Sequence, residues 1–471
     1  MNSGILLDQI AKEAMIERGL IPDFPPAVVK ETEAMHEEIA PSDLRDLRNY
    51  FFFSIDNEDS RDLDQLTFAE KNRVWIAIAD VNAYVKRGSP TDGYARHNTT
   101  SVYTPARIFP MLPLKLSNGL TSLNEGEDRS AMVVEIDVDP DGKIALRDLY
   151  PALVRNHAKL AYPHVAEWLE KSVPLQKGSK ELHDQLILQD ELAQRMLSFR
   201  TSHGALSFET VELTAIMDEG IAIGLSERAT NRALQLIENF MIAGNVAVTK
   251  FFMEKRLPIV RRIVRTPKRW DRIVWLAQSL GTRLPPKPDG KALRDFLLKE
   301  HQIHHDQFPD LSLAMIKLLG RGEYVLGTPG GGGHFDLALR DYAHTTAPNR
   351  RYPDLIMQRI LRAHFFSQPA PYPDSELIKI AKRCTDKEED AVKVERRLIK
   401  CAAAMTLEHR VGEQFFGMVT GAGRKGSWVR LDHPRIEGKL MRSDHVDVGD
   451  HVKVKLVFID VRKGHIDFEL V

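Results

Sequence analysis

The sequence predicts an α+β protein in three parts: a short helical segment at the N-terminus, one large mixed domain, and a small β-barrel at the C-terminus. Helix-like and strand-like apolar patterns follow one another from about residue 45 to residue 410 without an obvious linker. Residues 411–471 instead carry short strand-like runs separated by Gly and Pro. A length of 471 residues, with 43% hydrophobic residues, is sufficient for two to four globular domains.

Composition excludes several classes of protein. No apolar run approaches the roughly 20 residues needed to cross a bilayer, and the N-terminus lacks the basic flank and apolar core of a signal peptide. Cys384 and Cys401 are the only cysteines, which excludes a disulfide framework and a four-cysteine zinc site. We therefore expect a cytoplasmic protein without a membrane partner.

The net charge of −1 does not by itself indicate a nucleic-acid partner, so the distribution of charge matters more. Between Lys250 and Arg272 the chain carries nine Lys and Arg residues against Glu254 and Asp271. Such a run is typical of a solvated surface. It is also what a channel lined by phosphate-binding residues requires.

Residues 1–44 are predicted to form a helical module. Apolar residues recur at helical spacing from about residue 5 to 18, and Gly19 ends this helix. Pro25 and Pro26 open a second helix that we expect to continue to about Glu38. Two short helices joined tightly form either a nucleic-acid-binding helix-turn-helix or, more commonly, a simple packing unit.

The elements of the large domain follow from their apolar patterns. Val74–Asp80 has the length and composition of a buried strand, and residues 132–146 predict a β-hairpin. Ser226–Phe252 predicts one long, largely buried helix. Further helices are predicted from Pro353 onwards and between Leu377 and Val411.

The pattern changes to short strands near Val411. Five candidates, punctuated by glycines, suit an OB-type barrel: residues 415–420, 427–431, 436–440, 450–459 and 465–470. Trp428 and Arg430 combine a stacking face with a phosphate-seeking charge, which is typical of a surface that binds single-stranded nucleic acid. Trp428 fits a core position equally well.

The most informative stretch is an acidic loop that follows an apolar run at residues 51–55. Asp62 and Asp64 are two residues apart, so their carboxylates point the same way in an extended backbone, and Asp56 lies six residues earlier. Carboxylates this close repel unless a cation holds them ionised, and hard oxygen ligands suit Mg²⁺ or Mn²⁺. The loop therefore predicts either a metal site or a solvated acidic turn.

This loop resembles the active-site motif of the RNase II/RNB exoribonuclease family, I-D-(x)₅-D-x-D-D. Asp56, Asp62 and Asp64 fall on three of its four acidic positions, whereas Gln65 occupies the fourth. The resemblance implies that these three aspartates bind Mg²⁺, with Mn²⁺ as an alternative, and that Asp64 is also catalytic. The number of metals is open because of Gln65.

The resemblance extends over residues 45–471 in the family's order. It implies an RNB-type catalytic domain at residues 45–410 and an S1 RNA-binding domain at residues 411–471, where Phe416-Gly417-Met418-Val419 is similar to the S1 pattern. Trp428 and Arg430 are then candidate RNA contacts.

Four residues are assigned to substrate binding by the same resemblance. Tyr103, in a segment similar to the family's T-S-V-Y, is expected to clamp the 3′ end, and Phe208 to stack on a base. Glu238 is expected to bind a ribose hydroxyl, which distinguishes RNA from DNA, and Glu395 is a weaker assignment of the same kind. Without the family, Tyr103 fits a packed core residue and Glu238 a buried ion pair.

Residues 342–354 resemble the family's Y-x-H-F-T-S-P-I-R-R-Y-x-D segment. An arginine can stabilise charge that develops on phosphoryl oxygens, so Arg350 is assigned a catalytic role. Arg351 and His344 are expected to hold substrate, and Asp354 to orient an arginine. The glycine run at residues 330–333 predicts a flexible loop, and two adjacent arginines outside such a motif are most often surface charge.

The resemblance implies a 3′→5′ hydrolytic exoribonuclease that is Mg²⁺-dependent, acts processively on single-stranded RNA as a monomer, and releases nucleoside 5′-monophosphates. The first 44 residues are too short for a cold-shock barrel, so we also expect activity on structured RNA with a 3′ overhang. Two alternatives stay open: a catalytically impaired RNA-binding protein of the same fold, and a metal phosphodiesterase that acts on small nucleotides.

Overall fold

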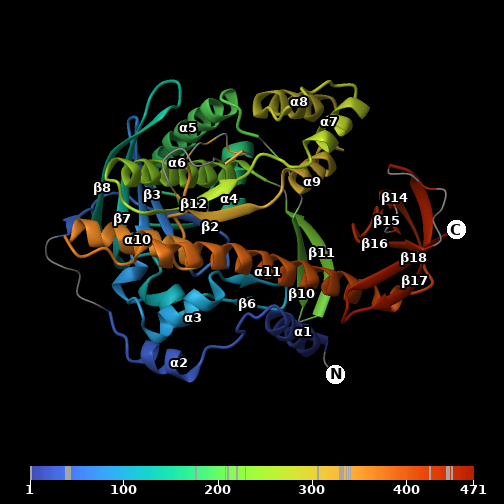
Figure 1. Ribbon diagram of the computed structural model, residues 1–471, viewed down its shortest axis with the longest axis horizontal. Helices are drawn as coiled ribbons and strands as arrows, with labels where there is room; N and C mark the ends of the chain where they lie inside the picture. The colour runs from blue at the N-terminus through green and yellow to red at the C-terminus, as the bar shows by residue number, and fades with distance from the viewer. Residues whose placement is uncertain are drawn as a thin grey trace.

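The computed structural model describes residues 3–37, 44–175, 178–206, 208, 212–218, 221–228, 230–304, 307–327, 334–335, 337, 339, 341–423, 426–441, 446 and 449–471. In these parts of the chain, helices and strands mix in a large body from which one long helix leads to a separate barrel (Figure 1). The α+β class is therefore confirmed. The glycine run at residues 330–333 lies outside the described residues.

A five-stranded sheet forms the centre of the large domain. Its order is β1 (Arg45–Asp46), β8 (Ile144–Arg155), β7 (Asp128–Val138), β4 (Arg73–Ala79) and β3 (Gln65–Glu70). Only β1 runs parallel to its neighbour, and the other pairs are antiparallel. The predicted buried strand and the predicted hairpin are both confirmed, as β4 and as the β7–β8 pair.

One face of this sheet is covered by α6 (Arg232–Glu254), which packs on β4, β7 and β8. Helices α4 (Tyr162–Lys171) and α5 (Lys180–Ser202) pack against α6 in turn (Figure 1). Burial on both sides explains the nearly continuous apolar pattern of α6.

The prediction of a helix from Ser226 was wrong at its start. Strand β11 (Ile221–Arg228) pairs with β10 (Glu212–Asp218) as a hairpin, and α6 begins only after Asn231. The Asn231 side chain accepts a hydrogen bond from the Leu234 amide, a strong N-terminal cap. The available signal for the boundary was the polar run at residues 226–232, in which Asn231 is a preferred N-cap residue.

Two helices carry the chain from the sheet to the barrel. Helix α10 (Tyr352–Phe365) begins within one residue of the predicted start at Pro353. Helix α11 (Asp374–Leu407) is a single helix of 34 residues. Figure 1 shows α11 crossing the molecule towards the C-terminal barrel. A separate apolar cluster is formed by α7 (Trp270–Ser279), α8 (Gly290–Ile303) and α9 (Phe308–Leu319).

Part of the basic run lies in the interior. It includes β12 (Ile259–Val264), which pairs with β13 (Gly322–Gly327). Arg261 is buried and pairs with Asp341, while Arg262 pairs with Glu388. These two arginines belong neither to a solvated surface nor to a phosphate-binding channel, because carboxylates already neutralise their charge. Both interpretations of the basic run are therefore wrong for them.

The five predicted C-terminal strands are all present and close into a barrel. Its order is β14 (Gln414–Gly423), β15 (Gly426–Leu431), β16 (Glu437–Met441), β18 (His465–Leu470) and β17 (His451–Asp460). On β15, Val429 is fully buried, so Trp428 and Arg430 on either side lie on the outer, half-buried face.

The two N-terminal helices have different packing partners. Helix α1 (Ser3–Glu17) packs on α11 and β11, whereas α2 (Pro26–Glu33) packs on α3 (Pro90–Asn98). Helix α2 ends five residues earlier than predicted. The described part of both helices thus serves packing within the large body.

Short elements surround the loops that matter below. Strand β2 (Ser54–Asp56) pairs with β9 (Lys159–Ala161), and β5 (Val102–Tyr103) pairs with β6 (Ile108–Phe109). A π-helical turn spans Lys115–Leu120. Among the described helices, none is long and apolar enough to cross a membrane.

A buried polar network should dominate the stability of the α3–α10 contact. Arg359 donates to Asp92, Tyr372 and the Val85 carbonyl, and it is 3% exposed. We expect Arg359→Met to lower the free energy of unfolding by about 3–5 kcal/mol, because Asp92 then stays buried without its cation. Urea unfolding measures this loss.

The matched control is Arg195→Met, which removes a surface ion pair with Glu191. It should cost less than about 0.5 kcal/mol. Equal losses for the two variants would contradict the role of the buried network.

Candidate functional site

The acidic loop, residues 57–64, is anchored at both ends by buried apolar residues. Ile55 precedes it in β2, and Leu63 and Leu66 bracket the start of β3. Within the loop, the Ser122 hydroxyl donates to the Arg61 carbonyl (2.7 Å) and accepts from the Leu63 amide (3.0 Å). These contacts fix the backbone on which the aspartates stand.

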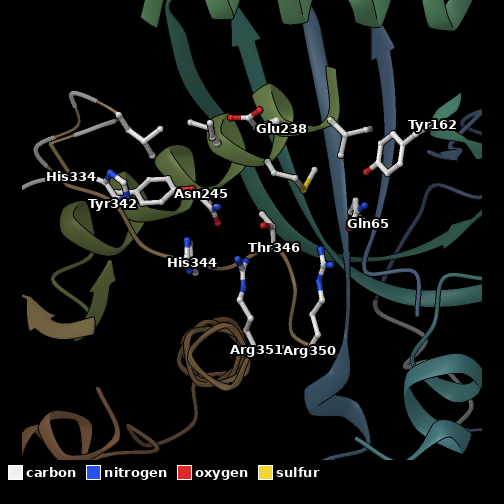
Figure 2. A pocket seen from close by; sticks show the side chains of 14 residues that line it. Gln65, Tyr162, Glu238, Asn245, His334, Tyr342, His344, Thr346, Arg350 and Arg351 are labelled. Atoms are coloured by element: carbon white, nitrogen blue, oxygen red, sulfur yellow. Dashed lines mark hydrogen bonds between the residues drawn. The ribbon is translucent and has the colours of Figure 1, made fainter. Parts of the chain in front are cut away.

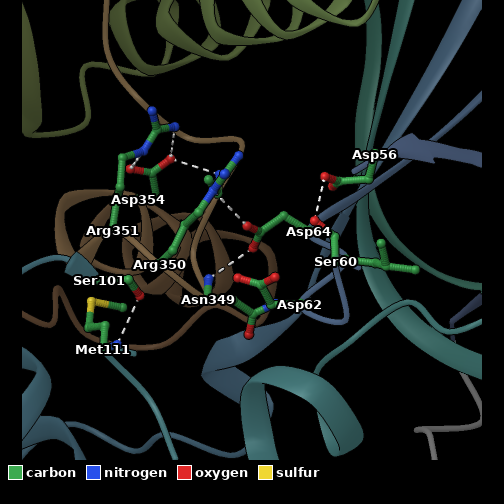
Figure 3. A network of polar contacts seen from close by, with 12 residues as sticks. Asp56, Ser60, Asp62, Asp64, Ser101, Met111, Asn349, Arg350, Arg351 and Asp354 are labelled. Carbon is green, nitrogen blue, oxygen red and sulfur yellow. Dashed lines mark hydrogen bonds and ion pairs between the residues drawn. The ribbon is translucent and has the colours of Figure 1, made fainter. Parts of the chain in front are cut away.

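The structure brings the three predicted aspartates to one place. In Figure 3, Asp62 and Asp64 lie next to each other, with Arg350 on one side and Asp56 across from them. Asp56 accepts hydrogen bonds from the Asn57 amide and from the Ser60 hydroxyl (2.8 Å). Asp62 accepts a hydrogen bond from the Tyr103 hydroxyl at 3.4 Å.

Asp64 is the most constrained of the three. Its side chain is 1% exposed, Oδ1 accepts a hydrogen bond from the Asn349 amide (2.9 Å), and Oδ2 lies 3.2 Å from Arg350 Nε. Burial raises the pKa of Asp64 to about 7, although Arg350 and the Asn349 amide oppose this shift. Burial likewise raises the pKa of Asp62, again against the attraction of Arg350.

Arg350 remains charged and partly open. Burial disfavours its charge, but the acidic groups around it, Asp64 foremost, raise its pKa above the usual value. Its side chain is 44% exposed. The guanidinium is therefore a fixed positive charge that solvent or a ligand can reach.

The segment before α10 is held from both sides. Arg351 donates two hydrogen bonds to Asp354, which also accepts from the Ala347 amide, so the predicted role of Asp354 is confirmed. On the other side, the Ser101 amide and the Thr100 hydroxyl donate to the Arg350 carbonyl (3.0 and 3.2 Å).

A cavity of about 320 Å³ lies next to Arg350 (Figure 2). Its described lining combines polar, aromatic and aliphatic side chains: Gln65, Tyr162, Ile237, Glu238, Met241, Ile242, Asn245, His334, Leu337, Tyr342, His344, Thr346, Arg350 and Arg351. Because Arg350 both lines the cavity and pairs with Asp64, the cavity and the acidic loop form one site.

Two predicted substrate residues face this cavity in different states. The Glu238 side chain is accessible to solvent, but the protein around it partly desolvates the carboxyl. This desolvation raises the pKa of Glu238 against the attraction of Arg200. His344 shares a hydrogen bond with the Tyr324 hydroxyl through Nδ1, and burial holds its pKa well below the usual value. His344 is therefore neutral at physiological pH and offers hydrogen bonds without charge.

Sequence reasoning missed Asn245. This buried side chain accepts hydrogen bonds from the Thr345 amide and hydroxyl, and it donates to the Tyr342 hydroxyl. It thereby fastens α6 to the segment that carries the arginines. A polar residue at a core position of the predicted helix was the available signal.

Other predicted residues lie elsewhere. Phe208 is partly buried against the α7–α9 cluster, and Trp428 and Arg430 lie on the barrel. Glu395 on α11 accepts a hydrogen bond from the Tyr103 amide (2.9 Å), so it supports β5. Gln65 is 4% exposed and lines the cavity, so its amide occupies the position of the fourth acidic residue without adding charge.

The acidic side chains fit a divalent cation in their chemistry. Asp64 Oδ2 is buried and accepts no hydrogen bond, although Arg350 Nε forms an ion pair with it, and Asp62 and Asp64, whose charge burial disfavours, lie beside each other. In the described part of the chain, however, no three His, Cys, Asp or Glu side chains converge closely enough to form a ready-made cage. Binding of a metal by Asp56, Asp62 and Asp64 stays a prediction.

The pKa of Asp64 predicts a pH-dependent stability in chelator. Because the folded pKa of about 7 lies above the ordinary value of 3.8, the folded state binds a proton more tightly than the unfolded state. Relative to Asp64→Asn, the wild-type protein should lose stability as pH rises from about 4 to 7. The loss is at most roughly 4 kcal/mol, at about 1.4 kcal/mol per pKa unit.

Urea unfolding at pH 4 and pH 8 measures this difference, and Asp59→Asn, at an exposed position of the same loop, is the control. Parallel pH profiles for the wild type and Asp64→Asn would show that Asp64 is not perturbed by burial.

Two family models match the chain. The RNB domain model matches residues 44–367, and the model of the RNase II-type exonuclease C-terminal S1 domain matches residues 413–471. The chain is 28% identical to ribonuclease R 1 of Lactococcus lactis over 97% of the chain and 60% of that relative. It is 30% identical to ribonuclease R of Thermotoga maritima over 98% of the chain and 70% of that relative.

Solved structures share the fold. RNase R of Mycoplasma genitalium, in complex with ribose-methylated single-stranded RNA, matches all of the chain and 78% of its own with a TM-score of 0.90 and 23% identity. Yeast Ssd1, described as a pseudonuclease, matches 96% of the chain and 58% of its own with a TM-score of 0.74 and 15% identity. The chain thus spans about 60–70% of the curated relatives above, and it belongs to the RNB family with an RNase II-type C-terminal S1 domain.

Proposed function

We propose that this chain is a metal-dependent 3′→5′ exoribonuclease that hydrolyses single-stranded RNA to nucleoside 5′-monophosphates. The observation that carries the proposal is the joint placement of a buried, arginine-paired Asp64, the neighbouring Asp62 and a cavity that shares Arg350. The curated relatives named ribonuclease R support the class of reaction.

Asp56, Asp62 and Asp64 are the residues that would hold Mg²⁺ or Mn²⁺. A bound divalent cation supplies a water of lowered pKa and positive charge for phosphoryl oxygens. A bound cation would lower the pKa of Asp62 and of Asp64, so both side chains would be ionised ligands.

Arg350 would contribute charge stabilisation. Its Nε already pairs with Asp64, and nearly half of its side chain is exposed towards the site. A guanidinium held in this way faces negative charge that develops on a phosphate without first having to be oriented. Arg351, by contrast, has two donors occupied by Asp354, so its contribution is to hold the segment and to contact substrate from the cavity wall.

The cavity would receive the terminal nucleotide. Its volume is at the lower end of the roughly 300–1,000 Å³ usual for small ligands, which favours one nucleotide over a longer segment. Glu238 and neutral His344 offer hydrogen bonds there, and a ribose 2′-hydroxyl is a partner for either. Tyr103, 40% exposed beside Asp62, would stack on a base next to the scissile phosphate.

Processive degradation would depend on the barrel. Trp428 and Arg430 lie side by side on its outer face. An aromatic side chain that stacks on bases, next to a cation that binds phosphates, can bind single strands of any sequence. Phe208 lies against the α7–α9 cluster, so a stacking role for it requires RNA to pass along these helices. We propose that the chain acts as a monomer.

The central test uses 5′-labelled single-stranded RNA with and without chelator. The wild type should shorten the RNA from its 3′ end only when Mg²⁺ or Mn²⁺ is present. Asp64→Asn should reduce the rate at least about 10³-fold while RNA still binds, because it removes one ligand charge and almost no volume.

Asp59→Asn, at an exposed acidic position of the same loop, should cleave at the wild-type rate. RNA binding without cleavage by the wild type would identify the chain as a catalytically impaired RNA-binding protein. Rapid cleavage of dinucleotides without preference for longer chains would identify a small-nucleotide phosphodiesterase.

A finer prediction concerns structured RNA. A related fold has been solved in complex with double-stranded RNA, RNase R of Mycoplasma genitalium. We expect a hairpin with a 3′ single-stranded tail to be degraded into its stem, as seen by gel electrophoresis. Accumulation of products that end well before the stem would contradict this expectation.

A further inference from the structure

The N-terminal arm, residues 6–37, contacts two segments that border the site, the β5–β6 hairpin and α3. Helix α1 buries Leu7, Ile10 and Met15 completely in a core that also contains Val102 and Phe109, apolar residues of α11, and the interior of the barrel. The arm therefore shares one apolar core with the β5–β6 hairpin, although nearly 100 residues separate them in sequence.

This shared core determines where Tyr103 points. Val102 is fully buried in the core and Tyr103 is 40% exposed, because neighbouring side chains of a strand face opposite sides. The exposed side places the Tyr103 hydroxyl 3.4 Å from Asp62. A shift of the hairpin against α1 would move Tyr103 relative to the acidic loop.

A polar contact reinforces the same connection. Arg107, in the turn between β5 and β6, pairs with Asp8 of α1 (3.4 Å), and its guanidinium lies over the Phe109 ring at 4.9 Å. Both charged side chains are about 40% exposed, so they can be replaced without disturbing the core.

The rest of the arm reaches the arginine side of the site. The backbone of Ile21 is bound at both its amide and its carbonyl by the Asn98 side chain (3.0 and 2.9 Å) at the end of α3. Immediately after α3, Thr100 and Ser101 bind the Arg350 carbonyl. At the other end of α3, Glu31 accepts hydrogen bonds from the Thr91 amide and hydroxyl.

We propose that the N-terminal arm is a positioning element for the catalytic site, which sets the β5–β6 hairpin and α3 relative to the acidic loop. The proposal rests on the proposed function in that its kinetic consequence is a change in RNA turnover. It assigns no contact with RNA to the arm. Loosening the arm should lower kcat more than it raises KM, because Tyr103 beside the scissile bond shifts while the other proposed RNA contacts, in the cavity and on the barrel, do not.

The test is a charge swap across the Asp8–Arg107 pair. Asp8→Arg places two cations together and should lower kcat on the order of tenfold. The double variant Asp8→Arg/Arg107→Asp restores opposite charges and should recover most of the rate. Lys12→Glu, which turns the Lys12–Asp23 pair within the arm into a repulsive one, is the matched control and should keep the wild-type kcat.

Hydrogen exchange of the hairpin amides gives a readout that does not need activity. The Tyr103 and Thr104 amides, bonded to Glu395 and to the Arg107 carbonyl, should exchange faster in Asp8→Arg and return towards wild type in the double variant. If the wild type does not degrade RNA, the proposed function fails. The exchange rates alone then decide whether the arm positions the β5–β6 hairpin.

Leu7→Ala provides a second perturbation, from within the shared core. It should lower the melting temperature, and in the folded protein it should also lower kcat and speed exchange in the hairpin. Unchanged kcat and unchanged hairpin exchange in both Asp8→Arg and Leu7→Ala would show that the arm is only a packing segment, and the proposal would be overturned.

Discussion

The burial of Asp64 against the Asn349 amide and the Arg350 guanidinium is the contact on which the site depends. It joins the loop before β3 to the segment before α10, which lie 285 residues apart in the sequence. An ionised carboxylate at 1% exposure would be strongly unfavourable alone, so the charged form of Asp64 depends on both partners. The site can therefore form only in the fully folded domain.

The partners of Asp64 are themselves held by neighbouring elements. Asp354 fixes Arg351, Ser101 and Thr100 bind the carbonyl of Arg350, and Asn245 holds Thr345 from the side of α6. The arginine segment is therefore bound from α10, from the end of α3 and from the long buried helix. Such support restricts the motion of the functional side chains, which is what preorganised electrostatic catalysis requires.

Local features were predictable from the sequence because their signals are local. The alternation of the barrel strands, the hairpin of the central sheet and the spacing of the three aspartates all appear within short windows. The orientation of Arg351 by Asp354 was predictable too, because positions three apart meet on a helical turn.

Features that depend on distant parts of the chain were not predictable in this way. Arg261 and Arg262 look like surface charge until β12 is placed beside their acidic partners. That Glu395 binds the backbone of Tyr103 becomes visible only when α11 is placed beside β5. The packing of α1 into a core shared with the hairpin and the barrel leaves only an amphipathic pattern in the sequence, and this pattern fits many partners.

The most direct test of the central claim is anomalous diffraction from crystals soaked in Mn²⁺. We predict a strong peak roughly 2.0–2.6 Å from carboxylate oxygens of Asp56, Asp62 and Asp64, with Asp64 still paired to Arg350. A peak at another place in the molecule, or none at concentrations that support RNA degradation, would contradict it.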